Sequence, residues 1–99
     1  MTRDQTTVRD VQPGERVALY PGSFDPVTLG HLDVLDRARS IFDRVVVGVL
    51  ANPSKAPLFS VDERGQILRS VIAERPGVDI GSFDGLTVEY AAEVGAIAI

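Results

Sequence analysis

The chain has 99 residues, a length that suits one domain, and its net charge of −4 argues against a general nucleic-acid-binding surface. A few local cations would still be enough for a nucleotide site. The sequence contains no cysteine, so disulfides, cysteine-bound zinc and thiol nucleophiles are excluded. No apolar run is long enough to span a membrane, and the composition suits the cytoplasm.

Residues 1–15 are polar and charged, and they lack the apolar centre of a secretory signal. We expect them to be a poorly ordered leader or a short extension. One domain then occupies residues 16–99.

The first half of this domain predicts a strand, a helix and a second strand. Residues 16–20 are typical of a short buried strand closed by a turn at Pro21-Gly22. Thr28 is suited to cap a helix over residues 29–42. Residues 44–51 are almost continuously apolar, as in strands buried on both faces of a parallel sheet. The apolar residues predicted to face inward from the helix are Leu32, Leu35, Ala38, Ile41 and Phe42.

The second half begins with Ser60 and Glu63, whose spacing is that of a capping box. They predict a helix that runs to about residue 74 with Ile67, Leu68, Val71 and Ile72 facing inward. The elements expected after it are a stop at 75–77, a strand at 78–81, a turn at 82–85, a helix at 86–94 with Gly95 as its C-terminal cap, and the start of a fourth strand at 96–99.

Strands that alternate with helices predict an α/β fold, a Rossmann-like parallel sheet with helices on both faces. Because an apolar strand is an unusual chain terminus, we expect a continuation beyond residue 99. Ligand sites in such sheets lie at the carboxyl ends of the strands. Three segments should gather there: residues 20–31, 51–60 and 81–87.

The first of these segments has the residues of a phosphate-binding corner. Gly22 permits close backbone approach, Ser23 offers a hydroxyl and an N–H, and His31, the one histidine, stands in the first turn of the helix. Asp25 is expected to have a structural role in the loop. Thr28 is interpreted as a helix cap rather than a ligand.

Three further strings extend this signal: Pro-Gly-Ser-Phe-Asp-Pro-Val-Thr-x-Gly-His, then Val-Gly-Val-Leu-Ala-Asn-Pro-Ser-Lys-x-Pro-Leu-Phe-Ser-x-x-Glu-Arg, then Ser-Phe-Asp-Gly-Leu. Residues 28–31 match the Thr/His-x-Gly-His signature of the nucleotidyltransferase superfamily. In order and spacing, the three strings resemble the bacterial phosphopantetheine adenylyltransferases. The resemblance covers about residues 16–99.

The resemblance implies transfer of the AMP part of ATP to 4′-phosphopantetheine, giving dephospho-coenzyme A and pyrophosphate by direct in-line attack. It assigns catalysis to His31, Lys55 and Ser23, with Ser23, Phe24 and His31 binding the nucleotide. The residues it assigns to the acceptor substrate are Ser23, Lys55, Leu86 and Thr87, of which Leu86 is also expected to be partly core and Thr87 is smaller and more polar than the family pattern.

The resemblance also implies Mg²⁺ accompanying ATP, a hexameric homo-oligomer and a cytoplasmic location. It implies an Arg-Gly-Leu-Arg segment after residue 99, so we expect little or no turnover from these 99 residues alone. Outside the motifs, Asp62, Glu63 and Arg64 are interpreted as cap and helix-face charges.

Other functions remain open on the sequence alone. A related nucleotidyltransferase could use nicotinate mononucleotide or glycerol 3-phosphate as acceptor, although such relatives tend to have histidine where Thr28 stands. An inactive, truncated ligand-binding fragment is a second alternative. An activator similar to aminoacyl-tRNA synthetases does not suit this length and charge.

Overall fold

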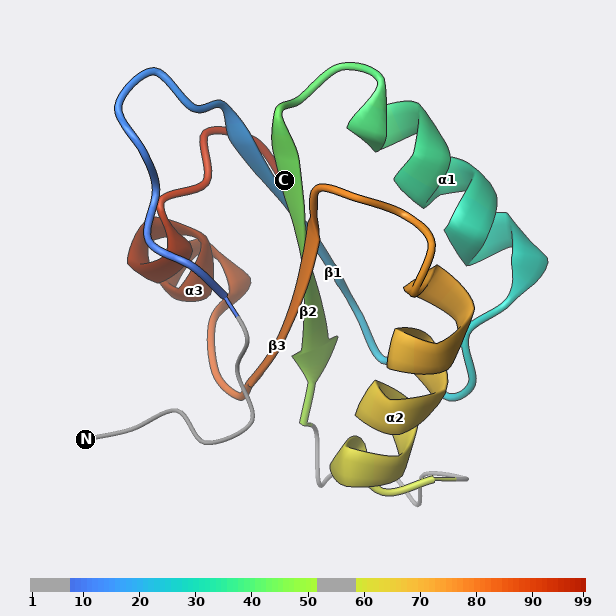
Figure 1. Ribbon diagram of the computed structural model, residues 1–99. Helices are drawn as coiled ribbons and strands as arrows, with labels where there is room; N and C mark the ends of the chain where they lie inside the picture. Colours follow the sequence, from blue (N-terminus) through green and yellow to red (C-terminus); the bar gives the residue numbers. More distant parts are fainter. Residues whose placement is uncertain (1–7, 52–58) are drawn as a thin grey trace.

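The computed structural model describes residues 8–51 and 59–99. Three parallel strands form a sheet in the order β1-β2-β3, with α1 and α2 on one face and α3 on the other (Figure 1). The elements are β1 (Val17–Gly22), α1 (Leu29–Arg39), β2 (Arg44–Leu50), α2 (Val61–Ile72), β3 (Val78–Phe83) and α3 (Thr87–Val94). The predicted α/β class, with helices on both faces, is confirmed.

The predicted fourth strand begins beside β1. Leu19 N–H donates to the carbonyl of Ala98 at 2.9 Å, and Ile97 N–H donates to the carbonyl of Val17 at 2.8 Å. Ala18 and Ala98 form a parallel bridge. This segment therefore lies on the side of β1 opposite to β2, as a parallel neighbour.

The turn predicted at Pro21-Gly22 is wrong, because β1 continues through both residues, which pair with Gly48 and Val49 of β2. The odd-numbered residues Val17 and Leu19 direct their backbone groups away from β2. Pro21 has the same parity, so its missing N–H falls on that side and removes no bond between β1 and β2.

The ends of three other elements also differ from the prediction. Helix α1 ends at Arg39, and its C-cap Ser40 donates its hydroxyl to the carbonyl of Arg37 at 2.6 Å. Ile41 consequently lies beyond the helix and is 56% exposed rather than inward. Helix α2 ends at Ile72, with Val71 exposed. Strand β3 includes Ser82 and Phe83, which the sequence assigns to a turn; pairing with β2 and burial of the Phe83 ring extend the strand.

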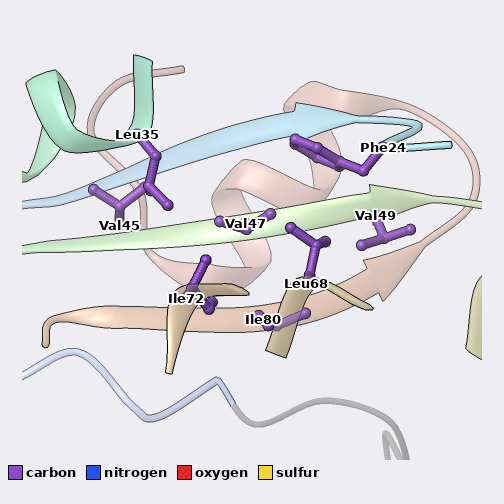
Figure 2. Packing of buried hydrophobic residues seen from close by; sticks show 8 residues of the cluster. All are labelled: Phe24, Leu35, Val45, Val47, Val49, Leu68, Ile72 and Ile80. Carbon is purple, nitrogen blue, oxygen red and sulfur yellow. The ribbon is translucent and has the colours of Figure 1, made fainter. Parts of the chain in front are cut away.

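The core has one apolar layer on each side of the sheet. The layer under α1 and α2 takes alternate residues of β2 together with one side of each helix (Figure 2). The layer under α3 contains the stacked rings of Phe83 and Tyr90, whose centroids are 4.5 Å apart. Gly48 faces this layer, and a Cβ there would lie 3.0 to 3.2 Å from the side chains of Leu19, Tyr90 and Phe83. Only glycine allows the rings to pack this closely on β2.

The sequence suggested a poorly ordered leader or a short extension over residues 1–15, and the part of it that the structure describes, residues 8–15, packs against the amino edge of the sheet. The side chain of Arg44 is fully buried there and donates to Glu15 at 3.0 Å and to Asp79 at 2.6 Å. The carbonyl of Asp10 also accepts from Arg44, and Arg9 N–H donates to Asp79. This Arg44 network fixes the N-terminal segment to β2 and β3; residues 1–7 lie outside the described part of the chain.

Candidate active site

At the carboxyl edge of the sheet, hydrogen bonds join described residues of the three predicted segments. Asp25, in the loop after β1, accepts a 2.9 Å hydrogen bond from Phe59 N–H just before α2. Ala51 N–H donates to the carbonyl of Phe83 at 2.7 Å, which joins the exits of β2 and β3. The structural role expected for Asp25 is thus a link between two loops.

His31 is held in a capping box at the start of α1. Thr28 N–H donates to Nδ1 of His31 at 2.9 Å, and His31 N–H donates to the Thr28 hydroxyl at 3.3 Å. The prediction that Thr28 caps the helix is confirmed. Because Nδ1 acts as an acceptor, the proton of the neutral imidazole lies on Nε2. The cap therefore sets the tautomer and leaves Nε2–H as a donor at the edge of the sheet.

Two aromatic side chains support the His31 ring. The Phe24 ring lies edge-on to it at 4.8 Å between centroids, and the Tyr20 ring lies at 6.3 Å. Phe24 is only 3% exposed and belongs to the core layer drawn in Figure 2. The Phe24 side chain thus packs in the core beside the His31 ring, and only the backbone of Phe24 is placed to contact a ligand.

The charge at the two helix N-termini differs. The first turn of α1 contains no acidic residue, whereas the first turn of α2 contains Asp62 and Glu63. Glu63 also accepts from Ser60 N–H at 2.8 Å, which confirms the predicted capping box. The positive end of the α2 dipole is therefore matched by its own carboxylates, while that of α1 is available to an anion.

The other predicted site residues are placed as follows. Ser23 is exposed in the loop between β1 and α1, and Thr87 is a partly buried residue in the first turn of α3. Leu86 is the N-cap residue of α3 and is 61% exposed, so the expectation that it is partly core is wrong. Lys55 lies outside the described residues.

Arg64 also differs from its prediction. It is 4% exposed rather than a helix-face charge. Its Nη1 donates to the carbonyls of Ser23 at 2.8 Å and Leu50 at 3.1 Å, and its Nε donates to the carbonyl of Ser60 at 3.3 Å. One signal could have revealed this, because Arg64 precedes Leu68 and Ile72 at intervals of four and so falls on the inward stripe of α2.

A cleft of about 170 Å³ lies between α2 and β3, with Val49 and Ile80 in its floor and Gln66 and Arg69 at its rim. None of the predicted site residues that the structure describes lines it. Within residues 8–51 and 59–99, no group of three or more acidic or histidine side chains is arranged to hold a metal ion. In the same ranges, no helix is both long and apolar enough to cross a membrane.

Comparison with known proteins agrees with this architecture. The cytidylyltransferase-like family model matches residues 19–99, and the chain belongs to that family. A phosphopantetheine adenylyltransferase of Caldanaerobacter subterraneus is 55% identical over 84 residues, which are 85% of this chain and 52% of the relative. That of Lachnoclostridium phytofermentans is 56% identical over 82% of this chain and 50% of the relative. The chain thus spans about half the length of these relatives.

Among solved structures, the bifunctional NMN adenylyltransferase/ADP ribose pyrophosphatase from Francisella tularensis, complexed with AMP and a Mn ion, has a similar fold. The TM-score is 0.65 at 19% identity, and the match covers 82% of this chain and 27% of the larger one. At this identity the match supports the fold alone.

Proposed function

We propose that this chain contributes to an adenylyltransferase that joins the AMP part of ATP to 4′-phosphopantetheine. A phosphate oxygen of the acceptor forms a bond to the α-phosphorus of ATP. The bond from that phosphorus to the bridging oxygen breaks, and pyrophosphate leaves with the electron pair. The products are dephospho-coenzyme A and pyrophosphate.

The choice of 4′-phosphopantetheine as the acceptor rests on the identity of 55% to 56% with enzymes named phosphopantetheine adenylyltransferase. The geometry supports the same reaction class, since His31 stands in the first turn of α1, which contains no acidic residue, and Ser23 lies in the loop that leads into this helix. The reaction needs no covalent enzyme intermediate. Catalysis then consists of positioning two phosphates and stabilising charge as it develops.

His31 would donate Nε2–H to a phosphate oxygen of ATP, in the tautomer fixed by Thr28. Ser23 would contribute its hydroxyl and backbone to the reacting phosphates. Lys55 would bind the acceptor phosphate and the departing charge. Leu86, which is exposed, and Thr87 would contact the pantetheine arm at the start of α3.

Mg²⁺ would enter as part of the Mg-ATP substrate, held mainly by phosphate oxygens and water. The described residues offer no cluster of three ligands for it. The family resemblance also supports a hexameric assembly and a location in the cytoplasm. Sedimentation of the purified chain would test the assembly state.

The direct test is a titration of this chain with Mg-ATP, Mg-CTP and 4′-phosphopantetheine, followed by amide NMR, with a parallel search for dephospho-coenzyme A by mass spectrometry. We expect Mg-ATP and phosphopantetheine to shift the amides of residues 22–31, and Mg-CTP to bind more weakly. Preference for CTP, or product with another phosphorylated acceptor only, would contradict the proposal. Binding without product would support the proposed ligands and indicate that turnover needs the additional length that the relatives have.

A further inference from the structure

The buried guanidinium of Arg64 donates hydrogen bonds to three backbone carbonyls from different segments. They belong to Ser23 in the loop after β1, Leu50 at the end of β2, and Ser60 at the N-cap of α2. Among the described residues, no carboxylate forms an ion pair with Arg64. The hydrogen bonds of Arg64 therefore go to backbone carbonyls. A buried charge bonded in this way fixes the backbone geometry of the segments that it joins.

The contact with Ser23 determines which way one peptide group faces. In a planar trans peptide the carbonyl and the following N–H point in opposite directions. The Ser23 carbonyl points to Arg64 at 2.8 Å, so Phe24 N–H points away from Arg64. No hydrogen bond from Phe24 N–H to another described residue is present. This N–H is therefore a donor directed out of the loop, next to the Ser23 side chain.

The backbone at Phe24 gives a second, independent observation. Its φ is 50°, in the left-handed region that bulky residues rarely adopt. Rotating the Ser23–Phe24 peptide by about 180° would bring φ of Phe24 to about −130°, an ordinary extended value. The observed orientation is thus the less favourable one locally, and something outside the loop must hold it.

We propose that Arg64 is a positioning residue that holds the Ser23–Phe24 peptide in this orientation and so presents Phe24 N–H to a phosphate of the bound nucleotide. The role rests on the function proposed above, because that function supplies the anion. Arg64 does not touch the ligand. It acts through the Ser23 carbonyl, from beneath the loop, while its bonds to Leu50 and Ser60 fix it to the sheet and to α2.

The test uses the purified 99-residue chain and three variants. Arg64→Met removes every donor, Arg64→Lys keeps a charged donor that can reach Ser23, and Arg37→Met removes an exposed arginine of α1 as a matched control. A crystal structure of each variant reports the direction of the Ser23 carbonyl and φ of Phe24. A titration with Mg-ATP, followed at the Phe24 amide, reports the affinity.

In Arg64→Met we expect the Ser23 carbonyl to turn outward, φ of Phe24 to become negative, and the affinity for Mg-ATP to fall about 10- to 100-fold, as for loss of a charge-assisted bond. Arg64→Lys should keep the positive φ and most of the affinity, and Arg37→Met should match the parent chain. A role in folding alone would lower the melting temperature without turning this one peptide.

Three results would overturn the proposal: an unchanged peptide in Arg64→Met, a turned peptide with unchanged affinity, or a Phe24 amide that Mg-ATP leaves unshifted while its neighbours move. If Arg64→Met does not fold, Arg64→Gln takes its place in the same measurements. If the parent chain binds no Mg-ATP, the proposed function and the presentation to a phosphate fail together, whereas the crystal structures still decide whether Arg64 holds the peptide.

Discussion

Two buried arginines, one at each edge of the sheet, have opposite surroundings. Arg44, at the amino edge, is paired with the carboxylates of Glu15 and Asp79 and is closed off by residues 8–15. Arg64, at the carboxyl edge, donates to three carbonyls and to no carboxylate among the residues described. Arg44 is neutralised where it lies, whereas the charge of Arg64 is only partly compensated by peptide dipoles.

This difference separates a structural edge from the edge that holds the proposed site. Paired ions at the amino edge fix a strand to its neighbours and cancel their own field. At the carboxyl edge the positive charge of Arg64 and the α1 dipole add, because α1 has no acidic residue in its first turn. Anions should therefore be attracted to the carboxyl edge, and the following variants test each half of the comparison.

The largest effect is expected at the amino edge. Arg44→Met would leave the mostly buried Glu15 and Asp79 with only their longer ion pairs to Arg9, at 3.9 and 3.8 Å, and the free energy of unfolding should fall by about 3–5 kcal/mol. Urea denaturation measures it, with Arg37→Met as an exposed control that should change stability by about 0.5 kcal/mol or less. A loss as small as that of the control would show that the Arg44 network does not secure this edge.

At the carboxyl edge, His31→Ala should weaken Mg-ATP binding about 10- to 100-fold, because Nε2–H is lost as a donor. Calorimetric titration measures the affinity. His31→Gln is the matched control, since glutamine at this position of a capping box still accepts from Thr28 N–H. Glutamine should restore the stability of α1; if it also restored full affinity, the imidazole would have no special part in binding.

A smaller effect is expected at the start of α2, which carries Arg64. Ser60→Ala removes the side-chain cap that accepts from Glu63 N–H at 3.1 Å, and should cost about 1 kcal/mol of unfolding free energy. The comparison variant is Ser70→Ala, an exposed serine within the same helix, which should be neutral or slightly stabilising. Equal effects at the two serines would argue against the cap.

The smallest effect is a dependence on pH at the amino edge. Hydrogen bonds from Arg44 and from Gln12 N–H lower the pKa of Glu15 from 4.5 to about 2. Since the folded-state pKa is lower, this contribution to stability is complete above about pH 4.5 and is lost as the pH falls toward 2. Melting curves should show a steeper loss for the parent chain than for Glu15→Gln. Parallel curves would place the acid sensitivity elsewhere.

Local sequence rules predicted the elements well wherever the pattern lies within a few residues. The capping boxes at Thr28 and Ser60 and the cap at Gly95, with φ of 76°, all follow from short-range chemistry. The apolar run of β2 could be predicted as a buried strand from its hydrophobicity alone. The errors in the strands concern Pro21 and Phe83, where pairing with β2 extends a strand past its local signal.

The site shows the same division. The sequence alone placed Ser23 and His31 at one edge of a parallel α/β sheet, because strand and helix alternate and a parallel sheet collects its carboxyl ends together. It could not place residues 8–15 or Arg64, because Glu15 pairs with Arg44, 29 positions away along the chain, and Arg64 bonds to Ser23, 41 positions away. Hydrophobic periodicity and caps are local and therefore legible in sequence, whereas the pairing of a buried charge depends on which backbone groups the folded chain brings within reach, and only the tertiary structure decided that.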